Sequence, residues 1–215
     1  MGVELTRKIS LDDHDSESAV RGLYHGGAAA FDPIEFDPIA VSLGFVVATA
    51  TFRLLYALIV LGHDRRRIIH FDVTENPTQV WLAHQMTEAF PWNTAPRYLL
   101  RDRDASYGAA FRDRVRVMGI NEVVTAPRSP WQNPYVERLI GSFRRECLDH
   151  VVIFDERHLR RTLLSYVQYD HRTRTHLSLD KDCPQTRSIS QPTGGKIIAF
   201  PEVGGLHHRY ERRAA

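Results

Sequence analysis

The sequence has few cysteines and no long apolar run, and each shortage narrows the class of protein. Only two cysteines occur among 215 residues, Cys147 and Cys183, and they form no Cys-x-x-Cys pair. This predicts neither a disulfide framework nor a zinc site and fits a cytoplasmic protein. The longest apolar run, Leu54 to Leu61, is far too short for a membrane span. The first residues do not read as a signal peptide, so we expect no membrane partner.

Lysine is also scarce, and the charge is unevenly distributed. Lysine contributes three of the 28 basic residues, and arginine the other 25. Residues 1–42 carry eight acidic and three basic side chains, a net charge of −5, so the remaining chain carries +7. Arginine binds phosphate oxygens through a planar fork of donors, so this basic body favours a polyanionic partner. A GC-rich genome that encodes arginine in place of lysine would give the same composition, and composition leaves both explanations open.

From about residue 43 the hydrophobic pattern becomes regular. Three adjacent β-type segments with short links predict an antiparallel meander. Segments of strand and helix type alternate after it, and Asn76 and Gln79 are expected to cap the first helix. This order predicts an α/β fold with a mixed sheet and helices on its faces. The expected strands are 45–51, 53–61, 66–74, 97–100 and 120–125, and the expected helices are 76–90, 107–118, 132–148 and one capped by Asp155.

Two carboxylates are candidates for metal binding. Asp102 directly follows the predicted strand at 97–100, at the carboxyl end where ligands gather in open α/β sheets. Glu137 lies in the first turns of the predicted long helix. If the two meet at the sheet edge, they provide the oxygen ligands that Mg²⁺ prefers. Such sites clamp the attacking and leaving oxygens of a phosphoryl transfer.

Each candidate also has a purely structural explanation. Glu137 shares a helix face with Arg144, and Arg145 lies close by, which offers a metal ligand and two phosphate-binding groups. The same face would equally suit an ordinary solvated helix surface. Asp102 would serve as well as an ion-pair partner of a neighbouring arginine.

Three segments resemble, in the same order, motifs of the integrase-core transposases encoded by insertion sequences. In the second of them Asn133 precedes Glu137 by four residues, and Gly141-Ser142-Phe143-Arg144-Arg145-Glu146 follows, as is typical of that family. The similarity runs from about residue 45 to the C-terminus. The segments are 100–107, which matches the second-aspartate motif; 129–138, which matches the surroundings of the catalytic glutamate; and 169–179 with Pro184 beyond, which matches the C-terminal signature.

The resemblance implies a ribonuclease-H-like fold, dependence on Mg²⁺ or Mn²⁺, and DNA cleavage and strand transfer at transposon ends. It assigns Asp102 and Glu137 as catalytic metal ligands, and it favours Asp102 over Asp104, which stands where relatives often have glycine. The implied partners are transposon-end and target DNA and further copies of the chain on DNA, in the cytoplasm and at the nucleoid. The residues expected to contact DNA are Trp131, Asn133, Arg138, Arg144 and Arg145, although Trp131 would also serve to pack its loop.

The first aspartate of the family pattern is missing. Counting back from the Phe-Val-Val stretch at residues 45–47 places it at Leu43 or Gly44, and neither side chain binds a metal. Asp37 is the nearest acidic residue upstream, and it would serve only if the strand were shifted. We therefore expect an N-terminally truncated or degenerate copy in which strand transfer is reduced by orders of magnitude.

Three parts and three functions follow from this reading. Residues 1–42 are expected to be an atypical, poorly ordered segment, residues 43–150 the integrase catalytic core, and residues 151–215 a C-terminal helix with a basic tail. The leading function is that of a DDE-type transposase core for DNA integration. If its chemistry requires the first aspartate, this core is expected to be inactive. The alternative is a non-catalytic DNA-binding remnant or regulator of an active transposase. The C-terminal signature disfavours a ribonuclease-H-like nuclease that only hydrolyses.

Overall fold

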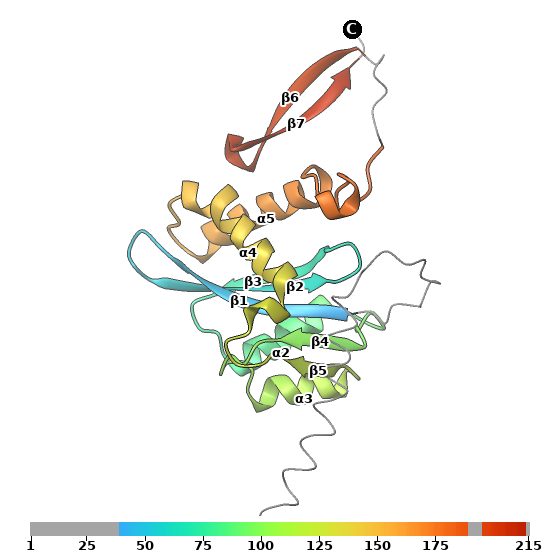
Figure 1. Cartoon of the computed structure of the whole chain (residues 1–215). Helices are drawn as coiled ribbons and strands as arrows, with labels where there is room; N and C mark the ends of the chain where they lie inside the picture. The colour runs from blue at the N-terminus through green and yellow to red at the C-terminus, as the bar shows by residue number, and fades with distance from the viewer. Residues whose placement is uncertain (1–38, 189–194, 214–215) are drawn as a thin grey trace, which may run out of the picture. The chain divides into compact units, whose positions relative to one another are not determined.

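The computed structural model describes residues 39–188 and 195–213 of the chain (Figure 1). Its central element is a five-stranded mixed sheet in the order β3-β2-β1-β4-β5. Strands β1, β2 and β3 form the predicted antiparallel meander, and β4 and β5 run parallel to β1. The strands are β1 (Ile39–Ala48), β2 (Leu54–Gly62), β3 (Ile68–Thr74), β4 (Tyr98–Arg101) and β5 (Asn121–Val124).

Helices cover both faces of this sheet, with α2 and α3 on one side and α4 and α5 on the other (Figure 1). A separate two-stranded hairpin, β6–β7, follows near the C-terminus. Within the described ranges no helix is long and apolar enough to cross a membrane. The helices are α2 (Gln79–Ala89), α3 (Ala109–Val117), α4 (Pro134–Glu146) and α5 (Glu156–Arg172); the 3₁₀ turns are η1 (Pro130–Gln132), η2 (Leu148–His150), η3 (Leu177–Leu179) and η4 (Val203–Gly205); the hairpin strands are β6 (Lys196–Glu202) and β7 (His207–Arg213).

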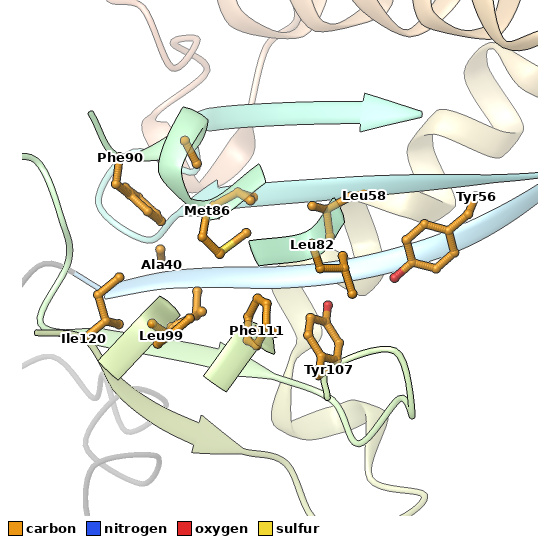
Figure 2. Close-up of a cluster of buried hydrophobic side chains, with 13 residues drawn as sticks. Ala40, Tyr56, Leu58, Leu82, Met86, Phe90, Leu99, Tyr107, Phe111 and Ile120 are labelled. Atoms are coloured by element: carbon orange, nitrogen blue, oxygen red, sulfur yellow. The ribbon is translucent and has the colours of Figure 1, made fainter. Parts of the chain in front are cut away.

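Alternate side chains of β1 point to opposite faces of the sheet. Ala40 belongs to the buried cluster formed with α2 and α3, where it lies near Leu99 and Met86 (Figure 2). Phe45 faces the other way, and its ring stacks on Phe143 of α4 at 6.2 Å. Because side chains along a strand alternate between faces, the odd-numbered residues of β1 point toward α4.

The first strand begins earlier than the sequence pattern predicts. We expected it from residue 45, but β1 starts at Ile39, so residues 39–42 of the predicted poorly ordered segment belong to the sheet. This stretch pairs with β2 on one side and with β4 on the other, as in Val41 with Leu61 and Leu100. A strand buried on both faces has no alternating polar pattern, which is why periodicity missed it. Asp37 lies outside the described residues.

The cap of α2 also differs from the prediction, whereas that of α5 agrees with it. Thr78, not Asn76, caps α2, and its hydroxyl accepts a hydrogen bond from a backbone N–H of the first turn. Gln79 does not reach back to the cap, because its side-chain oxygen accepts the backbone N–H of Ala110 at the start of α3. Asp155 caps α5 as predicted.

Candidate active site

The register between β1 and β4 sets the geometry of the candidate site. Ser42 pairs with Arg101 in the parallel ladder, so Leu43, in the middle of β1, lies beside Asp102, which directly follows the end of β4. Gly44 faces the opposite side of the sheet, because a Cβ built on it would lie 1.8 Å from the hydroxyl oxygen of Tyr56. Of the two sequence positions considered for the missing aspartate, Leu43 is therefore the one that faces the site.

A pocket of about 280 Å³ gathers side chains from β1, β4, the loop after β5 and α4. Leu43, Asp102 and Glu137 all line it, although 35 positions separate the two carboxylates in sequence. The structure thus brings together both predicted catalytic residues and the position expected for a third. The other lining residues are Arg103, Asp104, Thr125, Ala126, Pro127, Arg128, Ser129 and Asn133.

The arginines beside Asp102 are occupied elsewhere. The guanidinium of Arg101 bonds to Glu122 at 2.6 Å, and that of Arg103 donates to the carbonyl of Thr125 at 2.8 Å. Asp102 instead accepts the backbone N–H of Asp104 at 3.3 Å. Within the described part of the chain no ion pair joins Asp102 to an arginine, and the nearby charge of Arg101 lowers the pKa of Asp102 by less than burial raises it.

Both carboxyl groups hold their protons more tightly than usual. Burial raises the pKa of Asp102, and the negative charge of Asp104 raises it further. Burial also raises the pKa of Glu137, and the charge of Asp102 adds to that effect. Because each ionised form is disfavoured by lost solvation and by a like charge, a cation in the pocket would lower the free energy of both.

Asn133 contributes an unsatisfied donor to the pocket. It is 4% exposed, and its Nδ2 has no hydrogen-bond partner among the described residues. It stands at the N-cap of α4, yet its side chain makes no capping bond. A buried donor without a partner is costly, so this amide is suited to an acceptor that enters the pocket, such as a phosphate oxygen.

The other predicted DNA-contact residues lie outside the pocket on the surface. Trp131 is 70% exposed, and Arg138, Arg144 and Arg145 are exposed along α4. Arg144 donates to the carbonyl of Val46 at 3.2 Å, which holds its guanidinium beside the sheet edge. These side chains are placed to extend a contact surface from the pocket along the helix.

Two arginines of the pocket were missed by the motif comparison. Arg103 and Arg128 both line it. Arg128 also has a left-handed backbone, with φ of 56°, a conformation uncommon outside glycine that is frequent at functional sites. The signal for Arg128 was its place in a proline-bracketed loop directly before the glutamate motif, but the sequence alone does not say which way a loop folds.

The donor set fits one divalent cation better than two. Asp102 and Glu137 supply hard oxygen ligands at one pocket, and Mg²⁺ commonly takes one or two carboxylates and completes its shell with waters and substrate phosphates. Leu43 is apolar and 6% exposed, and it stands where a shared third carboxylate would lie. In the described ranges no group of three or more His, Cys, Asp or Glu side chains is placed to hold a metal ion.

Comparisons with known proteins agree with this geometry. Residues 118–184 match the family model described as integrase core domain, which includes Glu137 but not Asp102. The insertion element IS476 uncharacterized 39.2 kDa protein of Xanthomonas euvesicatoria is 24% identical over 168 residues, 77% of this chain and 49% of that protein. The chain therefore spans about half the length of this curated relative.

Solved structures share the fold at low sequence identity. A chain of the simian T-cell lymphotropic virus intasome, in complex with PP2A regulatory subunit B56 gamma, has a TM-score of 0.56 and 12% identity over 81% of this chain and 66% of that one. The catalytic domain of Mos1 mariner transposase has a TM-score of 0.54 and 12% identity over 71% and 77%. The Mos1 domain solved with raltegravir and Mg has a TM-score of 0.53 and 14% identity, over 61% and 71%.

The fold is ribonuclease-H-like, as predicted, and it is the fold of integrase and transposase catalytic domains. By resemblance, the chain is similar to polynucleotidyl transferases of the integrase and transposase type. Within that class, the integrase-core match and the insertion-element relative identify it as similar to insertion-sequence transposases with an integrase-like core.

Proposed function

We propose that the chain is the catalytic core of an insertion-sequence transposase, built for cleavage and transfer of DNA strands, with Asp102 and Glu137 as its surviving metal ligands. The observation that carries this proposal is the convergence of Asp102, Glu137 and Leu43 on one pocket at the carboxyl end of β4, beside the middle of β1. Transposon-end and target DNA are the proposed substrates. Further copies of the chain on that DNA are the proposed partners, in the cytoplasm and at the nucleoid.

The side chains around the pocket are proposed to bind either the metal ion or the DNA phosphates. The carboxylates of Asp102 and Glu137 would bind Mg²⁺ or Mn²⁺, which when bound polarises a phosphoryl group and stabilises the charge that develops there. Asn133 is proposed to donate its free amide N–H to a phosphate oxygen beside the carboxylates. Arg103 and Arg128 are proposed to bind the flanking backbone phosphates, since arginine forms paired hydrogen bonds with phosphate.

Leu43 is proposed to limit the activity. A leucine provides no ligand to share between two cations, so strand transfer should be reduced by orders of magnitude relative to a core with a carboxylate there. The same leucine favours a second candidate function, a DNA-binding remnant or regulator that keeps the fold but not the chemistry. The arginines on α4 would serve either role, because phosphate contacts position DNA without reading its sequence.

The proposed division of the chain follows the same argument. Residues 43–150 are proposed as the catalytic core, although β1 begins at Ile39. Residues 151–215 are proposed as a C-terminal part that includes α5 and the basic β6–β7 hairpin. Residues 1–38 lie outside the described part of the chain, and the proposed origin of 1–42 from a disrupted copy stays a sequence-based prediction.

Titration calorimetry with Mn²⁺ tests the metal site. We expect measurable binding by the native chain that is lost in Asp102→Asn and in Glu137→Gln. Asp113→Asn is the matched control, because it removes an exposed carboxylate of α3 that pairs with Arg116, away from the pocket. Binding that survives both pocket substitutions, or its absence from the native chain, would contradict the proposed metal site.

A nicking assay separates the two candidate functions. Supercoiled plasmid with Mn²⁺ should be nicked faster by Leu43→Asp than by the native chain, whereas Leu43→Asn, similar in shape but uncharged, should give no gain. Binding of a fluorescent duplex, measured by anisotropy, should be similar in the folded native and Leu43→Asn proteins. DNA binding without a gain of nicking in Leu43→Asp would favour the DNA-binding remnant.

A further inference from the structure

The C-terminal signature segment, which the sequence comparison singled out, contacts the back of α4 rather than the pocket. Arg174 donates through Nε and Nη2 to the two carboxylate oxygens of Glu146, at 2.8 and 2.7 Å. Its Nη2 also lies 3.3 Å from the hydroxyl of Ser142. Glu146 and Ser142 both belong to α4, the helix that carries Glu137. A paired arginine–carboxylate contact of this kind fixes direction as well as distance.

Burial and neighbouring groups hold this anchor in place. Tyr166 of α5 donates its hydroxyl to Glu146 at 2.7 Å. Burial alone would raise the pKa of Glu146, but hydrogen bonds from Arg174 and Tyr166 hold that pKa below its ordinary value, so Glu146 is ionised at neutral pH. Asp170, with its side chain 1% exposed, lies 3.7 Å from the guanidinium of Arg174. The guanidinium therefore lies between two carboxylates.

Helix geometry links this anchor to the pocket. Glu137 and Glu146 are nine residues apart on α4, and nine steps of about 100° give about two and a half turns. The two side chains therefore project from opposite sides of the helix. Fixing Glu146 against α5 turns Glu137 away from α5 and toward the pocket between the middle of β1 and the end of β4.

The N-terminal end of α4 makes contacts of a different kind: the ring of Tyr135 lies 4.2 Å from the guanidinium of Arg66 and meets the ring of His63 edge-on. Asn133 stands at its N-cap, but its side chain makes no capping hydrogen bond. Apolar packing of Val136 and Ile140 buries one face, yet apolar contacts are non-directional and constrain rotation less than a two-oxygen ion pair. The paired contact at Glu146 is therefore the charged, two-oxygen restraint on the rotation of α4, beside the single hydrogen bond from Arg144 to the carbonyl of Val46.

We propose that Arg174 is a positioning residue, which sets the rotation of α4 through Glu146 so that Glu137 faces Asp102. The contact between Arg174 and Glu146 does not depend on any metal. The inference rests on the proposed function of the pocket only in the claim that this contact positions Glu137 for metal binding. It gives the Arg-x-His part of the C-terminal signature a role in orienting the glutamate rather than in binding DNA.

Distance measurements between spin labels test the rotation directly. One label is placed on α4 at Arg138→Cys and a reference label in the turn between β1 and β2 at Thr51→Cys; both positions are exposed, whereas the native cysteines Cys147 and Cys183 are fully buried. With a side-chain radius of about 5 Å, a rotation of roughly 60° moves the α4 label by about 5 Å. We expect Arg174→Gln to shift or broaden the distance distribution by about that amount.

Arg160→Gln is the matched control. Arg160 lies on α5, whereas Arg174 follows its end; Arg160 pairs with Asp72 at 2.6 Å and with the carbonyl of Val73, and both partners belong to β3 and not to α4. We expect both substitutions to lower the melting temperature and only Arg174→Gln to change the α4 distance. If Arg174→Gln prevents folding, Glu146→Gln provides the milder variant, because it removes the charge and keeps the size of the side chain.

Mn²⁺ affinity gives the second readout and separates the two proposals. Where the native protein binds Mn²⁺, Arg174→Gln should weaken binding about tenfold or more while Arg160→Gln leaves it unchanged. A changed α4 distance in a protein that binds no Mn²⁺ would support the positioning role and contradict the metal site. An unchanged distance in folded Arg174→Gln and Glu146→Gln would overturn the inference, whatever the metal data show.

Discussion

Replacing Leu43 with aspartate should make the stability of this protein depend on metal. Leu43 is 6% exposed and lines the pocket beside Asp102 and Glu137. Without metal, Leu43→Asp adds a further negative charge beside two carboxyl groups whose pKa values burial and neighbouring negative charges already raise. The variant should therefore unfold more easily than the native chain at neutral pH, and a divalent cation should reverse much of the loss.

The size of the effect follows from three contributions. Burial of a leucine side chain contributes about 1.5–3 kcal/mol to the free energy of unfolding. Adding an uncompensated buried charge brings the total loss of that free energy to roughly 3–5 kcal/mol. Since domains are stable by only about 5–15 kcal/mol, this loss is a large fraction of the total. Metal at about 100 times its dissociation constant would return about 2.7 kcal/mol. For a chain of this size that corresponds to a rise in melting temperature of roughly 5–10 °C.

Differential scanning calorimetry with and without Mn²⁺ measures this directly. Leu43→Asn is the control, because it loses the same apolar burial without adding charge and should gain no more from the metal than the native chain does. Calcium-free buffer with a chelator defines the metal-free state. If Leu43→Asp melted at the native temperature without metal, or if Mn²⁺ stabilised Leu43→Asn equally, the assignment of position 43 to the metal site would be refuted.

Three further outcomes follow from the same structure. Because the folded-state pKa of Asp102 and Glu137 is raised, their stabilising contribution is present at low pH and lost as pH rises through the folded pKa. Asp102→Asn and Glu137→Gln should therefore raise the melting temperature at pH 7, and this gain should vanish near pH 3. Burial lowers the pKa of His171 below 6.5, and its Nε2 accepts a backbone N–H of β3. The stability that neutral His171 contributes is therefore present above pH 6.5 and is lost as pH falls through the folded-state pKa. His171→Gln should flatten this dependence in melting curves recorded from pH 7.5 to 5. Arg65 binds the carbonyl of Cys183 at 2.9 Å, so Arg65→Ala should speed the reaction of that buried thiol with an aromatic disulfide reagent, while the other buried cysteine stays slow.

Much of the fold was predictable because its elements carry strong local patterns. The meander, the alternation of strands and helices, and the buried stripe of Val136, Ile140 and Phe143 on α4 agree with the structure. The start of β1 was not predictable, because residues 39–44 are buried on both faces and lack a period of two. The cap of α2 was missed because Gln79 has a distant partner, the start of α3, which no local pattern reveals.

The candidate site was predictable in its residues but not in its arrangement. The motifs identified Asp102, Glu137 and Asn133, and the missing carboxylate was narrowed to two positions. Choosing Leu43 over Gly44 required the contact between Gly44 and Tyr56 across the sheet, which depends on the pairing of strands far apart in sequence.

The structure also explains how the chain keeps its fold with leucine at position 43. On β1 the odd-numbered side chains face α4, and Phe45 stacks on Phe143 only one position along that face. A leucine at position 43 extends this apolar contact to the edge of the pocket, where an unneutralised carboxylate would be repelled by Asp102. Compared with a carboxylate at this position, leucine therefore avoids a charge that would destabilise the metal-free fold. Under the proposed function, the same leucine stabilises the fold at the expense of a shared metal ligand.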